Sequence, residues 1–179
     1  MLAAKSKVLI IPGLFNSGPR HWQSLWQARH PEYERVVQGD WERPRCEDWI
    51  TMLDKYVAEA SGPVVLVGHS LGCATIAHWA GRFNGAIKGA LLVAPSDPEA
   101  ATYTFETEGF SPLPLRPLNF PSIVVASDND PYITVPRALQ FSEAWGSRLE
   151  NIGDAGHINA DSGFGEWPEG EKLLSELLS

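Results

Sequence analysis

Short runs rich in valine, isoleucine and leucine alternate with helical patterns along this chain, and this alternation restricts the fold more than any other feature. Four of the runs are apolar over nearly their whole length: Lys7–Ile11, Val64–Gly68, Ala90–Ala94 and Ser122–Ala126. Strands that are apolar on both faces are typical of a parallel sheet covered by helices on each side. Two more polar runs, Arg35–Gln38 and Arg148–Ile152, suit the edges of that sheet.

The segments between the runs show helical periodicity. The first predicted helix has Trp22, Leu25, Trp26 and Arg29 on one face, the second has an apolar stripe from Trp49 to Ala60, and the third is the alanine-rich stretch Leu71–Phe83. Pro136 begins a fourth helix, which carries Leu139, Phe141 and Trp145. Pro168 begins the last one, whose buried side is formed by Leu173, Leu174, Leu177 and Leu178. Alternating strands and helices predict the α/β class with right-handed crossovers.

Residues 95–121 depart from this alternation, because their six prolines predict a long irregular connection with room for one short helix. Connections of this length often bind ligands.

Composition narrows the class of protein. The 179 residues predict one domain, residues 1–179. A net charge of −8 argues against a nucleic-acid or anionic-membrane surface, because both partners need a basic face. No apolar stretch reaches the roughly 20 residues of a membrane span, and Val8–Ile11 is too short for a signal-peptide core. Because Cys46 and Cys73 cannot form a disulfide framework, we expect reduced thiols and a cytoplasmic protein.

The motif with the clearest chemistry is Gly68-His69-Ser70-Leu71-Gly72, a G-x-S-x-G that follows a buried strand and precedes a helix. Such a serine sits on a sharp strand-to-helix turn, and side chains two residues before and after it would collide. The turn raises Ser70 Oγ at the carboxyl edge of the sheet, which predicts a nucleophile. It also places the Leu71 N–H at a helix N-terminus, where it can bind a developing oxyanion. His69 is expected to pack or to hydrogen-bond locally.

A serine nucleophile needs a base and an orienting acid. In α/β-hydrolases the acid and then the histidine follow the serine along the chain. Of the five histidines, only His157 comes after the last predicted strand, in a loop where Gly156 permits a close turn. The acid is expected after Ser122–Ala126, where Asp130 is preferred because its loop must reach the histidine, and Asp128 is the alternative. Asp97, which follows the preceding strand, is the third candidate.

A second oxyanion donor is expected in the loop after the first strand. There Gly13 lets the backbone come close and Leu14 offers its N–H, with Phe15 and Asn16 as alternatives. Aromatic residues near the expected mouth of the site, which suit an apolar acyl or leaving group or else the core, are Phe15, Trp41, Phe105, Phe110 and Tyr132. Phe15 and Tyr132 are the candidates for substrate binding. No two histidines have HxH or HxxxH spacing, so no metal site is predicted.

Taken together, these residues resemble the α/β-hydrolase superfamily, and within it the small retinoblastoma-binding protein 9/YdeN-like serine hydrolases. The similarity covers essentially the whole chain and rests on the order of P-G-L-F-N-S with His21-Trp22-Gln23, G-H-S-L-G, A-P-S-D-P, S-D-N-D-P and G-H-I-N. It implies a three-layer α/β/α sandwich with a six-stranded, mainly parallel sheet in the order 2-1-3-4-5-6 and no cap domain. It also implies Ser70 as nucleophile, Asp130 as acid and His157 as base, with no cofactor.

Two departures from the family pattern stand out. Pro12-Gly13 occupies the place where larger α/β-hydrolases often have His-Gly, which leaves the second oxyanion donor open. A retinoblastoma-pocket motif, L-x-C-x-E, is absent, so no specific protein partner is implied.

The expected activity is that of a carboxylesterase-like serine hydrolase. It would cleave small carboxylic esters through an acyl-enzyme, with amides and thioesters also open. The alternative is a binding protein on the same fold with little or no turnover. A nucleotide-binding flavodoxin-like protein is disfavoured because the first loop lacks the G-x-G-x-x-G spacing.

Overall fold

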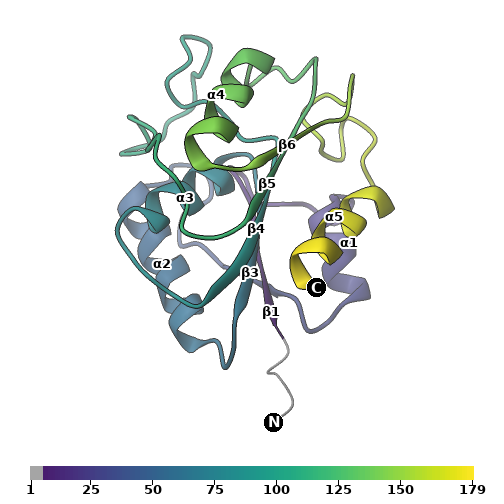
Figure 1. Ribbon diagram of the computed structural model, residues 1–179. Coiled ribbons are helices and arrows are strands. Elements are labelled where there is room, and N and C mark those ends of the chain that lie inside the picture. Colours follow the sequence, from purple (N-terminus) through teal and green to yellow (C-terminus); the bar gives the residue numbers. More distant parts are fainter. Residues whose placement is uncertain (1–5) are drawn as a thin grey trace.

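Apolar side chains on both faces of the central strands produce a parallel sheet between two layers of helices (Figure 1). The computed structural model describes residues 6–179, so residues 1–5 of the predicted domain lie outside the described part. The strands are β1 Lys7–Ile11, β2 Glu34–Arg35, β3 Val64–His69, β4 Ile87–Val93, β5 Ser122–Ala126 and β6 Arg148–Asn151. Their order is β2-β1-β3-β4-β5-β6, which confirms the prediction, and every described strand pair is parallel.

Two strands differ from the sequence prediction by more than one residue at an end, and β3 and β6 differ by one residue at their carboxyl ends. The first edge strand covers only Glu34–Arg35 instead of Arg35–Gln38, because the chain leaves the edge after the Val36 N–H has bonded to Ile10 O at 2.9 Å. The fourth strand begins at Ile87 rather than at Ala90. The added part of the strand includes the polar residue Lys88, which interrupts the apolar pattern. Its ammonium group is satisfied in the folded protein because it donates to Leu178 O at 2.7 Å.

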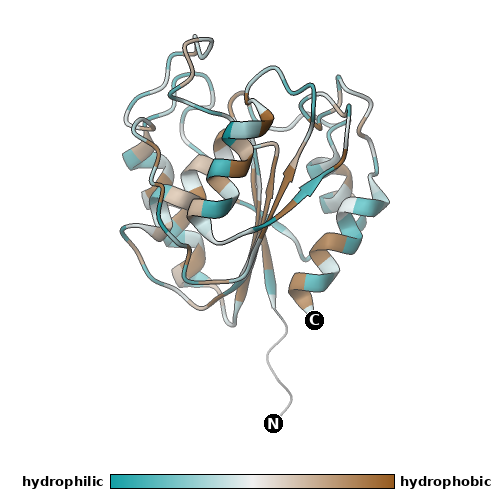
Figure 2. Ribbon diagram, turned by 45° about the horizontal axis from the view of Figure 1, so that its top comes forward, coloured by the Kyte–Doolittle hydropathy of each residue, from teal (hydrophilic) through white to brown (hydrophobic). Residues whose placement is uncertain are grey.

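The helices divide between the two faces of the sheet. Helices α2 Cys46–Glu59, α3 Leu71–Ala80 and α4 Val135–Trp145 pack on one face, and α1 Trp22–Arg29 and α5 Pro168–Leu178 pack on the other. The brown, apolar sides of the helices in Figure 2 turn toward the strands. The predicted sandwich is therefore confirmed. Within residues 6–179, no helix combines the length and apolarity that a membrane crossing requires.

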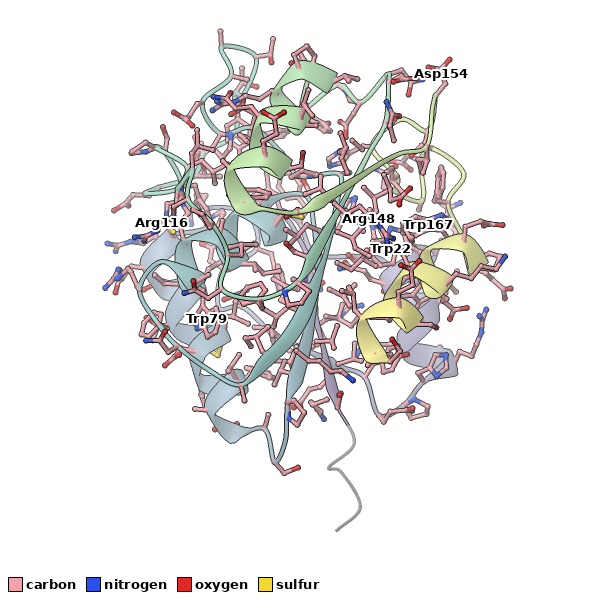
Figure 3. The ribbon with its side chains drawn as sticks, viewed as in Figure 1. Trp22, Trp79, Arg116, Arg148, Asp154 and Trp167 are labelled. Atoms are coloured by element: carbon pink, nitrogen blue, oxygen red, sulfur yellow. The ribbon has the colours of Figure 1, made fainter. Side chains whose placement is uncertain are left out.

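Tryptophan side chains fix α1 and α5 to each other. The ring of Trp22 lies 4.6 Å from that of Trp26 and 5.2 Å from that of Trp167, which directly precedes α5 (Figure 3). Both α1 indoles are fully buried and donate to backbone carbonyls beyond residue 157: Trp22 Nε1 to Ile158 O and Trp26 Nε1 to Glu166 O, each at 2.8 Å. This layer therefore holds the segment that follows β6.

The connection from β4 to β5 has no helix or strand between Val93 and Ser122, as its prolines predict, and the short helix left open does not form. Buried side chains anchor it instead, because Phe110 is 1% and Leu113 is 4% exposed. Its backbone is also bound: Cys46 N–H donates to Glu108 O at 2.8 Å, and Trp145 Nε1 donates to Pro114 O at 2.9 Å. The connection is thus fixed along much of its course.

The first turn of α3 presses against the carboxyl end of β1, and glycine makes this contact possible. A Cβ atom on Gly72 would lie 2.2 Å from Ile11 O and 2.9 Å from Pro12 O. A Cβ atom on Gly68 would lie 2.8 Å from Ile76 Cδ1. Steric contacts therefore explain why both of these positions in the G-x-S-x-G motif are glycine.

Replacing Gly72 by alanine should destabilise the fold by about 3 kcal/mol, because the new methyl group overlaps the β1 backbone, which cannot move without disturbing the sheet. Urea unfolding gives the change in free energy. The matched control is Gly39→Ala, since a Cβ atom there meets nothing within 4 Å. Equal stabilities of the two variants would contradict the steric account.

Candidate active site

Ser70 lies on the turn between β3 and α3 in a backbone conformation that side chains rarely adopt. Its φ is 55° and its ψ is −122°. Its N–H donates to Val93 O at 3.0 Å, which ties the turn to β4. Ala94 and Ile158, in the neighbouring loops, also have positive φ, of 45° and 47°. Strained residues of this kind persist where the surrounding fold over-determines them, and they concentrate at functional sites.

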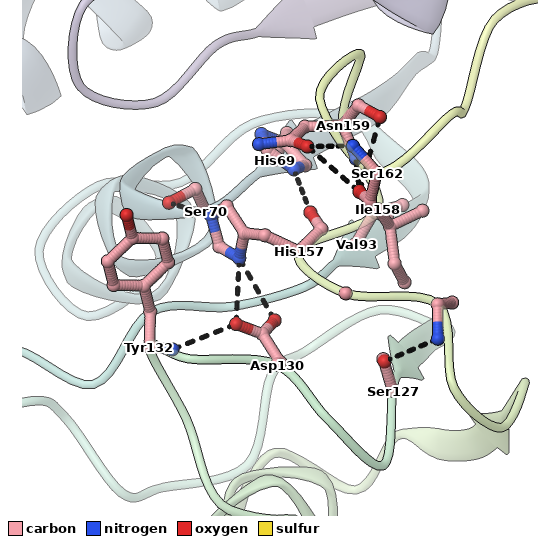
Figure 4. Close-up of polar contacts among 12 residues, drawn as sticks. His69, Ser70, Val93, Ser127, Asp130, Tyr132, His157, Ile158, Asn159 and Ser162 are labelled. Carbon is pink, nitrogen blue, oxygen red and sulfur yellow. Dashed lines mark hydrogen bonds and ion pairs between the residues drawn. The ribbon is translucent and has the colours of Figure 1, made fainter.

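A hydrogen-bonded chain joins Ser70, His157 and Asp130 (Figure 4). His157 Nδ1 lies 3.0 Å from Asp130 Oδ1 and 2.9 Å from Oδ2, and His157 Nε2 lies 2.9 Å from Ser70 Oγ. Because a carboxylate only accepts, Nδ1–H donates to Asp130, and the unprotonated Nε2 accepts from the Ser70 hydroxyl. The Asp130 side chain is 0% exposed and that of His157 is 9% exposed, so the hydrogen bonds between these two residues are shielded from water.

The structure brings Asp130 to the histidine and leaves the other two acids elsewhere. Asp130 is also held by the Tyr132 N–H, which donates to its Oδ1 at 2.9 Å. Asp128 is exposed and accepts from Asn151 Nδ2 at 2.7 Å, so it joins its own loop to β6. Asp97, near the end of β4, pairs with Arg137 at 2.9 Å.

The loop after β5 fixes the position of His157 through two of its side chains. Ser127 Oγ accepts from the Ala155 N–H at 2.9 Å, and Asn129 Oδ1 accepts from the Gly156 N–H at 2.6 Å. Gly156 has a φ of 57°, and a Cβ atom there would lie 2.7 Å from Ser162 Cβ. Only glycine suits this turn, as the sequence predicts.

His69 contributes to the same support from β3. Its Nε2–H donates to the carbonyl oxygen of His157 at 2.9 Å, so its role is the local hydrogen bond that the sequence analysis expected (Figure 4). Burial lowers the pKa of His69 well below its usual value, with His21 and His157 nearby adding to the effect. His69 is therefore a neutral donor.

The loop after β1 approaches Ser70 from the other side. A Cβ atom on Gly13 would lie 2.8 Å from Ser70 Cβ and 3.1 Å from the nitrogen of Leu71. The Phe15 N–H donates to Trp41 O at 2.8 Å and the Asn16 N–H donates to Gly13 O at 3.1 Å, so both are already engaged.

His21-Trp22-Gln23 organises this region from the start of α1. Gln23 is fully buried, and its Nε2 donates to Val67 O at 3.2 Å and to Ile11 O at 3.4 Å, which joins the carboxyl ends of β1 and β3. Its Oε1 accepts from Ser17 Oγ at 2.6 Å. Arg35 donates to Asn16 Oδ1 at 2.8 Å and to Ser17 O at 3.0 Å. The loop after β1 is thereby fixed at both ends.

Ser70 opens into a cleft of about 420 Å³. One side of the cleft is an aromatic wall formed by Phe15, Tyr103, Phe105 and Tyr132. Ring centroids are 6.2 Å apart for Phe15 and Phe105, 5.6 Å for Phe105 and Tyr132, and 4.6 Å for Tyr132 and His157. Trp41 and Phe110, also considered for the mouth, pack against the core instead.

His21 lines the cleft with an electrically neutral ring. Its Nδ1 accepts from the Gln23 N–H at 3.2 Å and so caps α1. Burial, with smaller effects of Arg35 and His157, lowers the pKa of His21 to about 3. Because Nδ1 is an acceptor and the ring is neutral above that pH, the proton resides on Nε2.

A further histidine and the two cysteines have structural surroundings. His78 bonds to Phe110 O at 3.0 Å, and its ring packs against the ring of Phe110. Burial raises the pKa of the Cys46 thiol to about 12 and that of Cys73 further, so both thiols stay protonated. Among residues 6–179, no group of three histidine, cysteine or acidic side chains is placed to hold a metal ion.

Sequence reasoning missed part of the site. His21 and Ser96 line the cleft, while Ser127 and Asn129 hold the His157 loop. All four belong to the motifs that carry the family resemblance, but the motifs do not reveal these roles, because each role depends on which loops meet in space. Tyr103 belongs to the irregular connection, whose path the sequence did not predict.

Comparison with known proteins agrees with this geometry. A family model described as serine hydrolase matches residues 8–176. A YdeN-like hydrolase from Pectobacterium atrosepticum is 34% identical, with 97% of this chain and 91% of that chain covered and a TM-score of 0.88. The ydeN gene product of B. subtilis is 22% identical over 96% of this chain and 98% of its own, with a TM-score of 0.82. These matches confirm the resemblance noted from the sequence.

More distant structures share the fold. Est1E from Butyrivibrio proteoclasticus, solved with ferulic acid bound, is 14% identical over 96% of this chain and 88% of its own, with a TM-score of 0.69. A search of curated proteins found no match.

The neutral His21 ring should make stability depend on pH. Between about pH 6.5 and pH 3 the unfolded chain binds a proton at this residue that the folded chain does not. Stability therefore falls as the pH falls through this range, and His21 contributes about 1.4 kcal/mol per pH unit to the slope. Urea unfolding at several pH values should show a shallower slope for His21→Asn, which keeps an oxygen able to cap α1. Identical slopes would contradict the burial argument.

Proposed function

The chain belongs to the serine hydrolase family, and we propose that it hydrolyses small carboxylic esters by attack of Ser70 on the acyl carbon. The observation that carries this proposal is the hydrogen-bonded chain itself. Ser70 Oγ lies 2.9 Å from His157 Nε2, and the opposite ring nitrogen lies within 3.0 Å of both Asp130 oxygens. A hydroxyl paired in this way has a base within proton-transfer distance, and the base has a fixed tautomer.

In the first half of the reaction, the Ser70 Oγ–C bond forms while the hydroxyl proton passes to His157 Nε2 and the carbonyl electrons move to oxygen. The resulting imidazolium is stabilised by the buried Asp130 carboxylate. Collapse of the intermediate breaks the bond to the leaving alkoxide, which takes the proton from Nε2. Water then attacks the acyl-enzyme with His157 again as base, which releases the acid and restores the Ser70 hydroxyl.

The oxyanion of this intermediate is assigned to the backbone N–H groups of Leu71 and Leu14. Leu71 is the first residue of α3, where the N–H has no partner within the helix. Leu14 follows Gly13, which approaches Ser70 and the Leu71 nitrogen closely. The engagement of the Phe15 and Asn16 N–H groups favours Leu14 over both alternatives.

Substrate size and polarity follow from the cleft. A volume of about 420 Å³ is at the lower end of small-molecule sites, which suits a compact ester. The aromatic wall begins at Phe15, which is 61% exposed, and ends at Tyr132 against His157. Phe15 and Tyr132 are thereby assigned to contact an apolar part of the acyl or alcohol group. Amides and thioesters fit the same chemistry.

Replacing any of the three hydrogen-bonded residues Ser70, His157 and Asp130 should greatly reduce the turnover of p-nitrophenyl butyrate. We expect kcat to fall at least about 10⁴-fold in Ser70→Ala and His157→Ala, and about 10²- to 10⁴-fold in Asp130→Asn, where the histidine loses its orienting charge. Initial rates of the purified variants provide the measurement, with circular dichroism as the check of folding. Ser175→Ala is the control, because that hydroxyl donates only to Glu171 O within α5.

A folded wild-type protein that hydrolyses no ester, amide or thioester would contradict the proposal. It would favour the alternative of a binding protein on this fold. Turnover that survives Ser70→Ala would contradict the assignment of the nucleophile instead.

A further inference from the structure

Three residues that line the cleft at Ser70 each carry a buried polar atom that lacks a partner in good hydrogen-bond geometry. Among residues 6–179, four buried side-chain atoms lack a partner in good hydrogen-bond geometry: His21 Nε2, Ser96 Oγ, Tyr103 Oη, which the Thr107 side chain approaches, and Glu171 Oε1. Glu171 Oε1 lies 3.5 Å from His30 Nε2, and Glu171 does not line the cleft. The other three residues all line the cleft that contains Ser70. Because buried polar groups in folded proteins are nearly always paired, this concentration calls for a partner from outside the chain.

All three atoms are hydrogen-bond donors without charge. The Nδ1 atom of His21 accepts from the Gln23 N–H at 3.2 Å, which leaves the proton of the neutral ring on Nε2. The hydroxyls of Ser96 and Tyr103 can donate as well. His21 is 6% exposed and Ser96 is 3% exposed, so the donors of both are held within the wall of the cleft.

Other polar side chains of the cleft are satisfied within the protein. His69 Nε2 bonds to His157 O at 2.9 Å, Asn16 Oδ1 accepts from Arg35 at 2.8 Å, and Asn159 Oδ1 accepts from Ser162 Oγ at 2.8 Å. The two charged side chains that line it, Arg20 and Asp161, are exposed and opposite in sign. The three donors are thus an exception among the buried polar atoms of the residues that line the cleft, and their surroundings favour a ligand without net charge.

One of the three donors, Tyr103, belongs to the aromatic wall. The ring of Tyr103 lies 5.3 Å from that of Phe105, which contacts Tyr132 at 5.6 Å. An apolar surface and a set of neutral donors therefore occupy the same cleft. A plain alkyl group would cover the rings but leave the donors unpaired.

We propose that His21 Nε2–H, Ser96 Oγ–H and Tyr103 Oη–H bind neutral oxygen acceptors of the substrate, so that the preferred substrates are esters whose acyl or alcohol part carries an ether, carbonyl or hydroxyl oxygen. This inference rests on the proposed ester hydrolysis at Ser70 and names the substrate class of that site. It assigns to these three residues a role in specificity.

Isosteric ester pairs test the inference because they differ by one oxygen in place of one methylene. The acyl pair is p-nitrophenyl methoxyacetate and p-nitrophenyl butyrate, and the alcohol pair is 2-methoxyethyl acetate and n-butyl acetate. For each pair, the ratio of kcat/KM is compared between wild type, Ser96→Ala and Tyr103→Phe, which cancels the intrinsic reactivity of the esters. We expect the ratio of the oxygen-bearing ester to its isostere to fall about fivefold to tenfold in at least one pair.

Thermal unfolding separates this role from a structural one. Deleting an unpaired hydroxyl should leave Tm unchanged or raise it in Ser96→Ala and Tyr103→Phe. Ser122→Ala is the matched control, since that serine is also buried but its hydroxyl is hydrogen-bonded to Ser147 Oγ at 2.6 Å, and it does not line the cleft. We expect a lower Tm and an unchanged ester ratio for this control. Unchanged ratios in folded Ser96→Ala and Tyr103→Phe would overturn the inference.

Failure of the proposed function gives a different result, namely a wild type that hydrolyses neither member of any pair. Binding then decides the inference, measured by NMR titration of the Ser70→Ala protein with methyl methoxyacetate and methyl butanoate. We expect tighter binding of methyl methoxyacetate, and loss of this preference when Ser96→Ala and Tyr103→Phe are added. Equal affinities for the two esters would overturn it.

Discussion

The position of the reactive serine depends on one crowded contact, where the first turn of α3 meets the carboxyl end of β1. A Cβ atom on Gly72 would lie 2.2 Å from Ile11 O, and one on Gly13 would lie 2.8 Å from Ser70 Cβ. Backbone can therefore approach the serine from both sides only because these residues have no side chain. The same approach brings the backbone at Gly13 close to the Leu71 nitrogen, so the oxyanion assignment proposed for Leu14 and Leu71 depends on the same steric constraint.

The strained parts of this site depend on the buried sheet beneath them. Ser70, Ala94 and Ile158 have positive φ values, and each lies at or just beyond the carboxyl edge of the sheet. The central strands β3 and β5 are buried along their whole length, so the loops extend from a scaffold that tolerates local strain. Side chains from beneath complete the support: Trp22 binds Ile158 O and His69 binds His157 O.

Features with a local physical cause were predictable from the sequence, and features that depend on long-range contacts were not. The turn at Ser70 follows from a buried strand, two glycines and a helix, all within a few residues. Asp128 and Asp130 both follow β5, and only the folded loops show that Asp130 reaches His157 while Asp128 bonds to Asn151. The polar Lys88 was missed at the start of β4 because its partner, Leu178 O, is 90 residues away. The unpaired donors of His21 and Ser96 were likewise invisible until the cleft that they line was formed.

The central claim, that Ser70 is an activated nucleophile, is tested most directly by finding where a fluorophosphonate attaches. After reaction and trypsin digestion, mass spectrometry locates the added phosphonyl group. The account predicts that it lies on the peptide of residues 56–82, with fragment ions assigning it to Ser70 and not to Ser61, the other serine of that peptide. Attachment elsewhere, or no attachment to the folded protein, would contradict the claim.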